Sequence, residues 1–180
     1  MKVNVGSILE IRGGTISIQG KEEVDISNIQ LGLKLFKPVE VNGAVTNTGK
    51  GFLVKADLFF EYQVNCGRCL ESFMASQHAL VQEQFESGGI GYEPGSAPDS
   101  DLIYYFRGDV IDLKDCFREQ IILALPMSFV CGPECKGFCA NCGRNLNRQV
   151  CNCTTEISNL KFEKLKDLLI NKGGGSNGKP

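Results

Sequence analysis

The 180-residue chain contains no tryptophan and a single histidine, His78. A Ser-His-Asp hydrolase needs a histidine base, and imidazole-rich metal sites need more than one histidine. His78 lies in the middle of an expected strand with no sequence partner, so we interpret it as a surface or packing residue. The single histidine therefore excludes most hydrolase triads and histidine-rich metal sites.

The chain also lacks long apolar runs and nucleotide-binding motifs. No segment approaches the roughly 18–20 apolar residues of a membrane helix, and the N-terminal sequence lacks the apolar core and cleavage site of a signal peptide. Neither GxxxxGK[ST] nor GxGxxG occurs between a strand and a helix. We therefore expect a cytoplasmic protein with no membrane association and no small-molecule substrate, in a compartment that keeps thiols reduced.

The charges are unevenly distributed along the chain. Residues 1–130 carry 11 Lys+Arg and 17 Asp+Glu, a net −6, whereas residues 131–180 carry 8 and 4, a net +4. A basic C-terminal part favours an anionic partner, although ordinary surface charge explains the difference equally well.

The apolar pattern predicts an α+β protein with an antiparallel β-rich body and one core helix. Alternation and turn signals indicate strands at 3–11, 15–19, 24–29, 39–45, 52–64, 73–85 and 102–106. Within these, Gly43 is a candidate bulge and 75–84 could also be helical. Asp112 is expected to cap a helix that ends before Pro126.

Four parts of the chain follow from this pattern. They are a β-rich body at 1–126 with its helix at 112–125, a cysteine-rich metal-binding module at 127–153, a C-terminal amphipathic helix at 154–172, and a flexible tail at 173–180. The amphipathic pattern is clearest over Ser158–Asn171.

Six of the nine cysteines fall within the module. They are Cys131, Cys135, Cys139, Cys142, Cys151 and Cys153. A CxxC turn directs both sulfurs at one ion, and Gly143 supplies the positive φ that such a turn often needs. Cys139 and Cys142 form the clearest half-site, with Cys151 and Cys153 as the best second half and Cys131 and Cys135 as an alternative or additional pair. We predict that the bound metal is structural zinc. An iron–sulfur cluster is disfavoured, because the cysteine spacing typical of ferredoxins is absent.

Cys66-Gly-Arg-Cys69 forms a second CxxC between two expected strands. It could be half of a metal site completed by cysteines of the module, a redox dithiol, or a tight turn with two buried thiols. A thioredoxin-like dithiol requires a βαβ context, which is not found here. The remaining cysteine, Cys116, is expected to be an inert core residue.

Four basic residues lie in or beside the cysteine turns and are candidate RNA contacts: Arg68, Lys136, Arg144 and Arg148. Zinc knuckles present such residues, together with small aromatics, to single-stranded bases. Phe138 is the only aromatic residue of the module. Solubilising charge explains the same residues equally well.

Three segments together resemble a known bacterial family. They are Cys66-Gly-Arg-Cys69-Leu-Glu-Ser-Phe, Glu119-Gln-Ile-Ile-Leu-Ala-Leu-Pro-Met, and Cys135-Lys-Gly-Phe-Cys-Ala-Asn-Cys142-Gly-Arg-Asn-Leu-Asn, followed by Cys151-Asn-Cys153. This combination is similar to the YceD family, the large ribosomal RNA subunit accumulation proteins. Phe138 and Ala140 stand where that family usually has Leu and Pro.

The resemblance implies a non-enzymatic, cytoplasmic ribosome-biogenesis factor that supports accumulation of large-subunit ribosomal RNA, by binding precursor rRNA or an assembly partner. It implies that the cysteines at the matching positions are metal ligands, and it implies no catalytic residue. Two other functions stay open: a thiol oxidoreductase using Cys66 and Cys69, and a zinc-stabilised scaffold for protein interactions.

Overall fold

The computed structural model describes residues 1–29, 32–88 and 103–153. The chain forms two compact units, Met1–Cys135 and Lys136–Pro180. The predicted C-terminal helix at 154–172 and the tail at 173–180 lie outside the described residues. Within those residues, no helix is long and apolar enough to cross a membrane.

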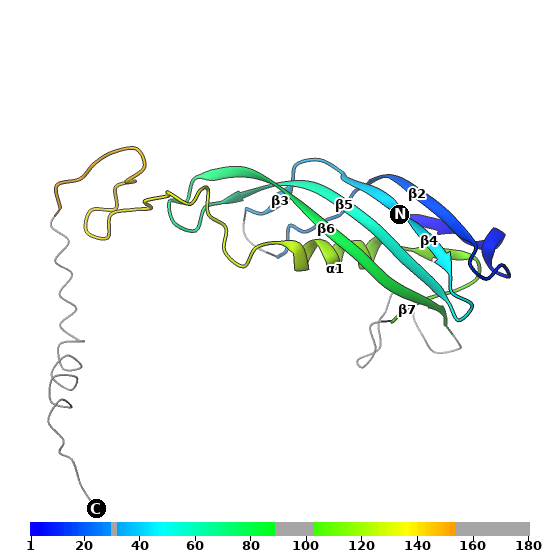
Figure 1. The fold of residues 1–180 in the computed structure, drawn as a ribbon. Coiled ribbons are helices and arrows are strands. Elements are labelled where there is room, and N and C mark those ends of the chain that lie inside the picture. Colours follow the sequence, from blue (N-terminus) through cyan, green and yellow to red (C-terminus); the bar gives the residue numbers. More distant parts are fainter. Residues whose placement is uncertain (30–31, 89–102, 154–180) are drawn as a thin grey trace, which may run out of the picture. The chain divides into compact units, whose positions relative to one another are not determined.

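A curved, mostly antiparallel sheet forms the first unit (Figure 1). Its main path is β2 (Thr15–Glu22), β4 (Val39–Asn47), β5 (Phe52–Asn65), β6 (Ser72–Ser87) and β7 (Ile103–Phe106), and β3 (Lys34–Leu35) also pairs with β5. All pairs are antiparallel except β6 with β7, which is parallel. A separate two-stranded ladder joins β1 (Lys2–Asn4) to β8 (Val110–Asp112).

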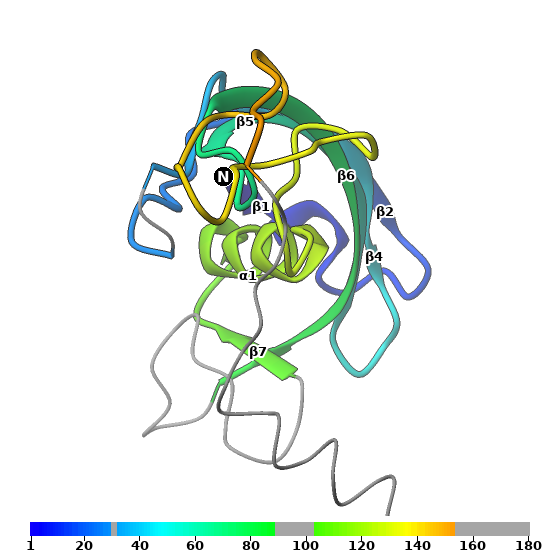
Figure 2. The same ribbon diagram turned by 90° about the vertical axis from the view of Figure 1, so that its left-hand side faces the viewer.

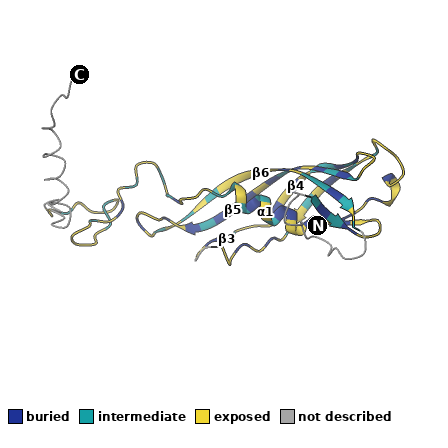
Figure 3. Ribbon diagram, turned by 90° about the horizontal axis from the view of Figure 1, so that it is seen from below, coloured by how far each residue is buried: buried dark blue, intermediate teal, exposed yellow. Residues whose placement is uncertain are grey.

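Strand β5 shows most clearly how the sequence produces the sheet. Its side chains alternate between the two faces, as the pleat requires, and the predicted inward residues Leu58, Phe60, Tyr62 and Val64 are all buried. Figure 3 colours the strand by burial, with buried positions alternating with intermediate or exposed ones. The period-2 pattern therefore identifies the core face correctly.

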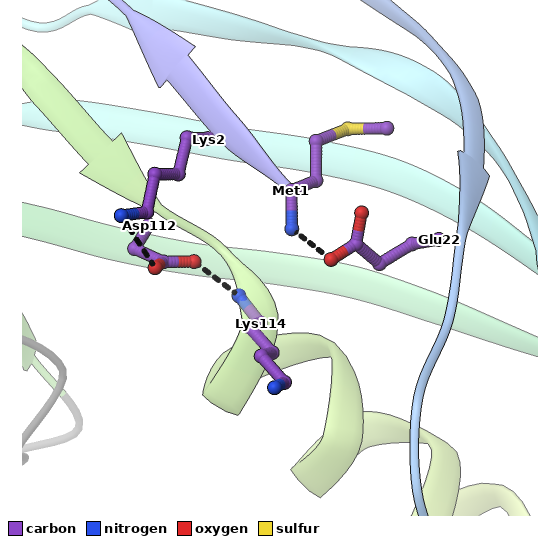
Figure 4. A network of polar contacts seen from close by, with 5 residues as sticks. All are labelled: Met1, Lys2, Glu22, Asp112 and Lys114. Atoms are coloured by element: carbon purple, nitrogen blue, oxygen red, sulfur yellow. Dashed lines mark hydrogen bonds and ion pairs between the residues drawn. The ribbon is translucent and has the colours of Figure 1, made fainter.

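Helix α1 (Lys114–Ala124) lies in the concavity of the sheet (Figure 2). It buries Cys116, Phe117 and Ile121 in the same core as the strands. The Asp112 carboxylate accepts the backbone N–H of Lys114 at 3.1 Å and lies 4.0 Å from Lys2 Nζ (Figure 4). The predicted α+β body with one core helix is thus confirmed. The predicted cap is wrong, because the N-cap residue of α1 is Leu113 and not Asp112, and the N-cap side chain makes no capping hydrogen bond. In the same view the amino group of Met1 pairs with Glu22.

Several local expectations are wrong. Residues 24–29 form no strand, and in 3–11 the strand ends at Asn4, before a 3-10 turn at Gly6–Ile8. Gly43 is not a bulge, because it pairs in regular register with both Ile18 and Ala56. A Cβ added at Gly43 would lie 2.3 Å from the carbonyl oxygen of Lys55, so close approach of β5 is the reason for glycine there.

Candidate metal centres

Eight of the nine cysteines form two groups of four. The body cluster is Cys66, Cys69, Cys131 and Cys135, and the module cluster is Cys139, Cys142, Cys151 and Cys153. Within each group all four sulfur atoms lie within 4.8 Å of one another, close enough to share a metal ion. The body cluster falls entirely within the first compact unit and the module cluster within the second.

The body cluster has the sulfur spacing of a tetrahedral tetrathiolate site. Cys66 Sγ lies 3.8 Å from Cys135 Sγ, and Cys69 Sγ lies 3.7 Å from Cys131 Sγ. A tetrahedron with metal–sulfur bonds of about 2.3 Å has sulfur–sulfur edges of about 3.8 Å. A disulfide would need about 2.05 Å, and all four thiols are free. The cluster can therefore hold one ion without rearrangement of these pairs.

Two distant segments supply the body cluster. Cys66 and Cys69 lie in the connection between β5 and β6, whereas Cys131 and Cys135 follow α1. The backbone N–H of Gly67 donates to the Phe129 carbonyl at 2.8 Å, and the Phe129 ring packs edge-on against Tyr62 at 5.7 Å between centroids. The hydrogen bond and the ring contact fix the second segment against the hairpin, so the thiols are brought together by the fold itself.

The Cys66 turn closes on itself through two backbone hydrogen bonds. Cys66 N–H donates to the carbonyl of Glu71, and Leu70 N–H donates to the carbonyl of Cys66, each at 2.9 Å. Leu70 has a φ of +55°, the only positive φ among the described non-glycine residues. Left-handed backbone is costly for a residue with a Cβ, so this turn is held in shape against a local preference.

The Cys139 turn has the same two bonds at equivalent positions. Cys139 N–H donates to the Arg144 carbonyl at 2.8 Å, and Gly143 N–H donates to the Cys139 carbonyl at 2.9 Å. Gly143 has a φ of +68°, as predicted for the residue after the second cysteine. The two CxxC segments are therefore the same local structure, with Leu70 in one where Gly143 stands in the other.

Backbone N–H groups favour the thiolate form of the leading cysteine in each turn. Burial alone would raise the pKa of Cys66, but backbone donors from Cys131, Cys69 and Arg68 outweigh it and lower that pKa to about 6. Two of these donors, Arg68 N and Cys131 N, lie 3.4 Å from Cys66 Sγ.

Cys139 behaves in the same way. Backbone donors from Cys142 and Asn141 lower its pKa to about 6. Thiolates are the metal-binding form of cysteine, so both turns present their first sulfur in the form that an ion requires.

Cys116 is the cysteine that joins neither group. It is fully buried in the core, and burial raises the pKa of its thiol to about 12. It therefore packs as a small apolar residue, as the sequence suggested.

The sequence leaves the ligand sets open. The structure matches the alternative in which the first CxxC is half of a metal site that cysteines of the module complete. Cys66 and Cys69 lie with Cys131 and Cys135, which are not spare thiols of the module. The available signal was the count, since six thiols in the module are two more than one ion needs. The partner pair could not be identified from sequence, because their proximity depends on where α1 ends relative to the β5–β6 hairpin.

The candidate RNA contacts fall in both units. In the first unit, Arg68 is exposed and its guanidinium donates to the Cys135 carbonyl at 3.2 Å. In the second, Lys136, Arg144 and Arg148 are exposed, and the ring of Phe138 is 40% exposed. Phe138 forms an isolated bridge with Asn145, which makes a miniature hairpin around the Cys139 turn.

Comparison with known proteins supplies a family. Residues 54–169, more than half of the chain, match the sequence profile described as "Large ribosomal RNA subunit accumulation protein YceD". The chain belongs to the YceD family. The profile begins within β5 and includes all eight cysteines of the two clusters.

Individual YceD relatives are more distant. The chain is 31% identical over 88 residues to "Large ribosomal RNA subunit accumulation protein YCED homolog 1, chloroplastic" of Zea mays, covering 46% of this chain and 30% of the relative. The protein of the same name from Arabidopsis thaliana is 33% identical over 58 residues, 32% of this chain and 18% of the relative. An uncharacterized protein of Mycobacterium bovis is 29% identical over 103 residues, 55% of this chain and 47% of the relative.

The matched segments span less than half of the length of these relatives. No solved structure matches the chain significantly.

Proposed function

We propose that this protein is a non-enzymatic factor that supports accumulation of large-subunit ribosomal RNA, by binding precursor rRNA or an assembly partner in the cytoplasm. The observation that carries this proposal is the YceD family match over residues 54–169. The plant relatives carry the same description in their names. No catalytic role is assigned to any side chain.

The second part of the proposal is that both cysteine clusters hold structural zinc. Four thiolates satisfy a tetrahedral zinc ion and leave no position for the water that a catalytic zinc keeps. The sulfur spacings of 3.8 and 3.7 Å in the body cluster support this geometry. In the second unit, a metal replaces the hydrophobic core that a short, polar segment cannot build.

RNA contact is assigned to the second unit, with Arg68 as a candidate on the first. Lys136, Arg144 and Arg148 are exposed cations around a cysteine turn whose one aromatic ring, Phe138, is partly exposed. Cations bind the phosphate backbone, and an exposed ring offers a stacking surface for an unpaired base. The basic balance of residues 131–180 supports the same assignment.

Deletion of the gene tests the cellular function. We expect reduced mature large-subunit rRNA with altered precursors, measured against small-subunit rRNA in the same cells. Normal precursors and normal large-subunit rRNA after deletion would remove the proposal. Crosslinking in cells, followed by separate identification of RNA and protein, distinguishes direct RNA binding from a scaffold for protein interactions.

A charge-matched pair of variants tests the RNA surface. Changing Lys136, Arg144 and Arg148 to alanine should abolish crosslinking to RNA and reproduce the deletion. The control changes three exposed lysines of the first unit to alanine: Lys2, Lys21 and Lys55. Equal loss of crosslinking in both variants would assign the effect to net charge and contradict the proposed surface.

Thiol exchange by Cys66 and Cys69 is the second candidate function, because the lowered pKa of Cys66 suits a nucleophilic thiol. We favour a bound ion as the more direct explanation, since the sulfurs of Cys66 and Cys69 lie 3.8 and 3.7 Å from those of a second cysteine pair. Alkylation of the zinc-loaded protein separates the two. If the cysteines hold a metal, alkylation of Cys66 should be slow and should become rapid after chelation. If they form a redox dithiol, alkylation should be rapid both before and after chelation.

A further inference from the structure

Strand β6 has one incompletely paired edge. It pairs with β5 from Ser72 to Phe85, but on its other side it pairs with β7 only at residues 84–87. In the part of the chain that the structure describes, residues 72–83 have no strand partner on that side. A long unpaired edge is a template for an added strand, and natural sheets usually protect such edges.

Helix α1 lies beside this edge and forms a depression with it. Gln77 Nε2 donates to the Ala124 carbonyl at 3.0 Å, which connects the strand to the end of the helix. The depression has a volume of about 300 Å³ and is lined by His78, Ala79, Leu80, Gln120, Leu123 and Ala124. Leu80 is 68% exposed and Leu123 is 75% exposed, so two large apolar side chains flank the open backbone.

Two carboxylates lie at one end of the same edge. Glu83 of β6 accepts from Gln120 Nε2 at 2.7 Å, and Glu119 of α1 accepts from the Tyr104 hydroxyl. Neither forms an ion pair with any described cation. The pKa of Glu83 is raised by its partial burial and by the charge of Glu119. This end of the edge is therefore a concentration of negative charge.

We propose that residues 72–83 of β6, together with the adjoining face of α1, bind an extended segment of a partner protein by strand addition. Apolar side chains of the segment contact Leu80 and Leu123, and an arginine or lysine pairs with Glu83 and Glu119. Charge complementarity favours a basic polypeptide as the partner, because the two carboxylates would repel a polyanion such as RNA. This interaction goes beyond the RNA-directed role proposed for the second unit.

Strand addition predicts a specific pattern of backbone protection. Main-chain hydrogen bonds supply much of the affinity in this mode, and alternate side chains supply the specificity. Along residues 72–83, every second amide points toward the open edge. The exchange rates of these alternate amides should fall when a strand is added. The exchange rates of their neighbours, which are already bonded to β5, should change little.

The test is a titration of the full zinc-loaded chain with synthetic peptides, followed by amide hydrogen exchange. One peptide alternates arginine and valine over about eight residues, an ordinary strand length, and a second alternates glutamate and valine. We expect the basic peptide alone to bind and to protect alternate amides of residues 72–83. The double variant E83Q/E119Q should weaken binding about tenfold, which corresponds to about 1.4 kcal/mol.

The control variant is E40Q/E61Q, which removes two carboxylates that pair with Lys21 and Lys37 elsewhere on the sheet. It should leave the affinity unchanged. Equal binding of both peptides, protection outside residues 72–83, or equal loss in the two double variants would overturn the proposal. Perturbation of the same amides by a single-stranded RNA oligonucleotide, with none by the basic peptide, would assign the edge to RNA instead and would also overturn it.

Discussion

The Sγ atoms of Cys66 and Cys135 lie 3.8 Å apart, although 69 positions separate the two residues in the chain. Cys66 belongs to the connection between β5 and β6, and Cys135 is the last residue of the first compact unit. An ion bound at this point would join the end of a long hairpin to the segment that follows the core helix. The body cluster is therefore expected to stabilise the first unit, in addition to whatever the module cluster does for the second.

Removing half of each cluster should have separable effects. C66S/C69S should lower the unfolding midpoint of the first unit, because a structural ion contributes its binding free energy to folding. C139S/C142S should leave that transition in place. The measurement is thermal unfolding followed by the near-ultraviolet tyrosine signal, because all four tyrosines of the sequence belong to the first unit. Identical shifts in the two variants would contradict independent centres.

The backbone strain at Leu70 gives a second prediction. Leu70 has a positive φ and is 66% exposed, so a glycine there relieves strain and sacrifices little packing. L70G should raise the free energy of unfolding by up to about 1 kcal/mol, since left-handed backbone costs a residue with a Cβ about 1–2 kcal/mol and glycine has its own entropic cost. Chemical denaturation of the zinc-loaded protein measures the difference.

The controls for this prediction are L70A and G143A. L70A keeps the Cβ and should show no gain, which separates backbone strain from loss of the leucine side chain. A Cβ at Gly143 would meet no atom within 4 Å, so G143A reports the conformational cost alone and should destabilise the second unit. A gain in L70A equal to that in L70G would show that the side chain, and not φ, is the cause.

The pKa of Glu83 predicts a pH dependence of stability. Burial and the charge of Glu119 raise this pKa above its ordinary value of 4.5, so ionisation of Glu83 destabilises the folded state. The penalty is absent below pH 4.5, grows as the pH rises toward the raised pKa, and is complete above it. E83Q should therefore be more stable than the parent protein at neutral pH, with a difference that shrinks toward zero near pH 4.

Solvent screens much of the charge of Glu83, which is only partly buried. The gain in stability of E83Q at neutral pH should therefore stay below about 1 kcal/mol. Denaturant titrations at several pH values measure it, with E40Q as the control for loss of one surface charge. A pH-independent difference between E83Q and the parent protein would contradict the assigned cause.

The sequence predicts much of the body and only part of the candidate site. The alternation in β5 is a local signal and identifies its core face correctly. The Asp112 signal identifies the presence of α1 but not its cap, because the N-cap residue is Leu113. The parallel pairing of β7 with β6 and the close approach at Gly43 depend on contacts between distant strands, which no local pattern encodes. The grouping of Cys66 and Cys69 with Cys131 and Cys135 fails to emerge for the same reason, whereas the Cys139 turn was predicted because its ligands and Gly143 are adjacent in sequence.

The central claim is that the chain holds two zinc ions, one in each cysteine cluster. Native mass spectrometry of the purified protein, with elemental analysis of the same sample, tests it most directly. We predict two zinc ions in the parent protein, one in C66S/C69S, one in C139S/C142S, and none when the four substitutions are combined. A single ion in the parent protein, or loss of both ions from either double variant, would contradict it.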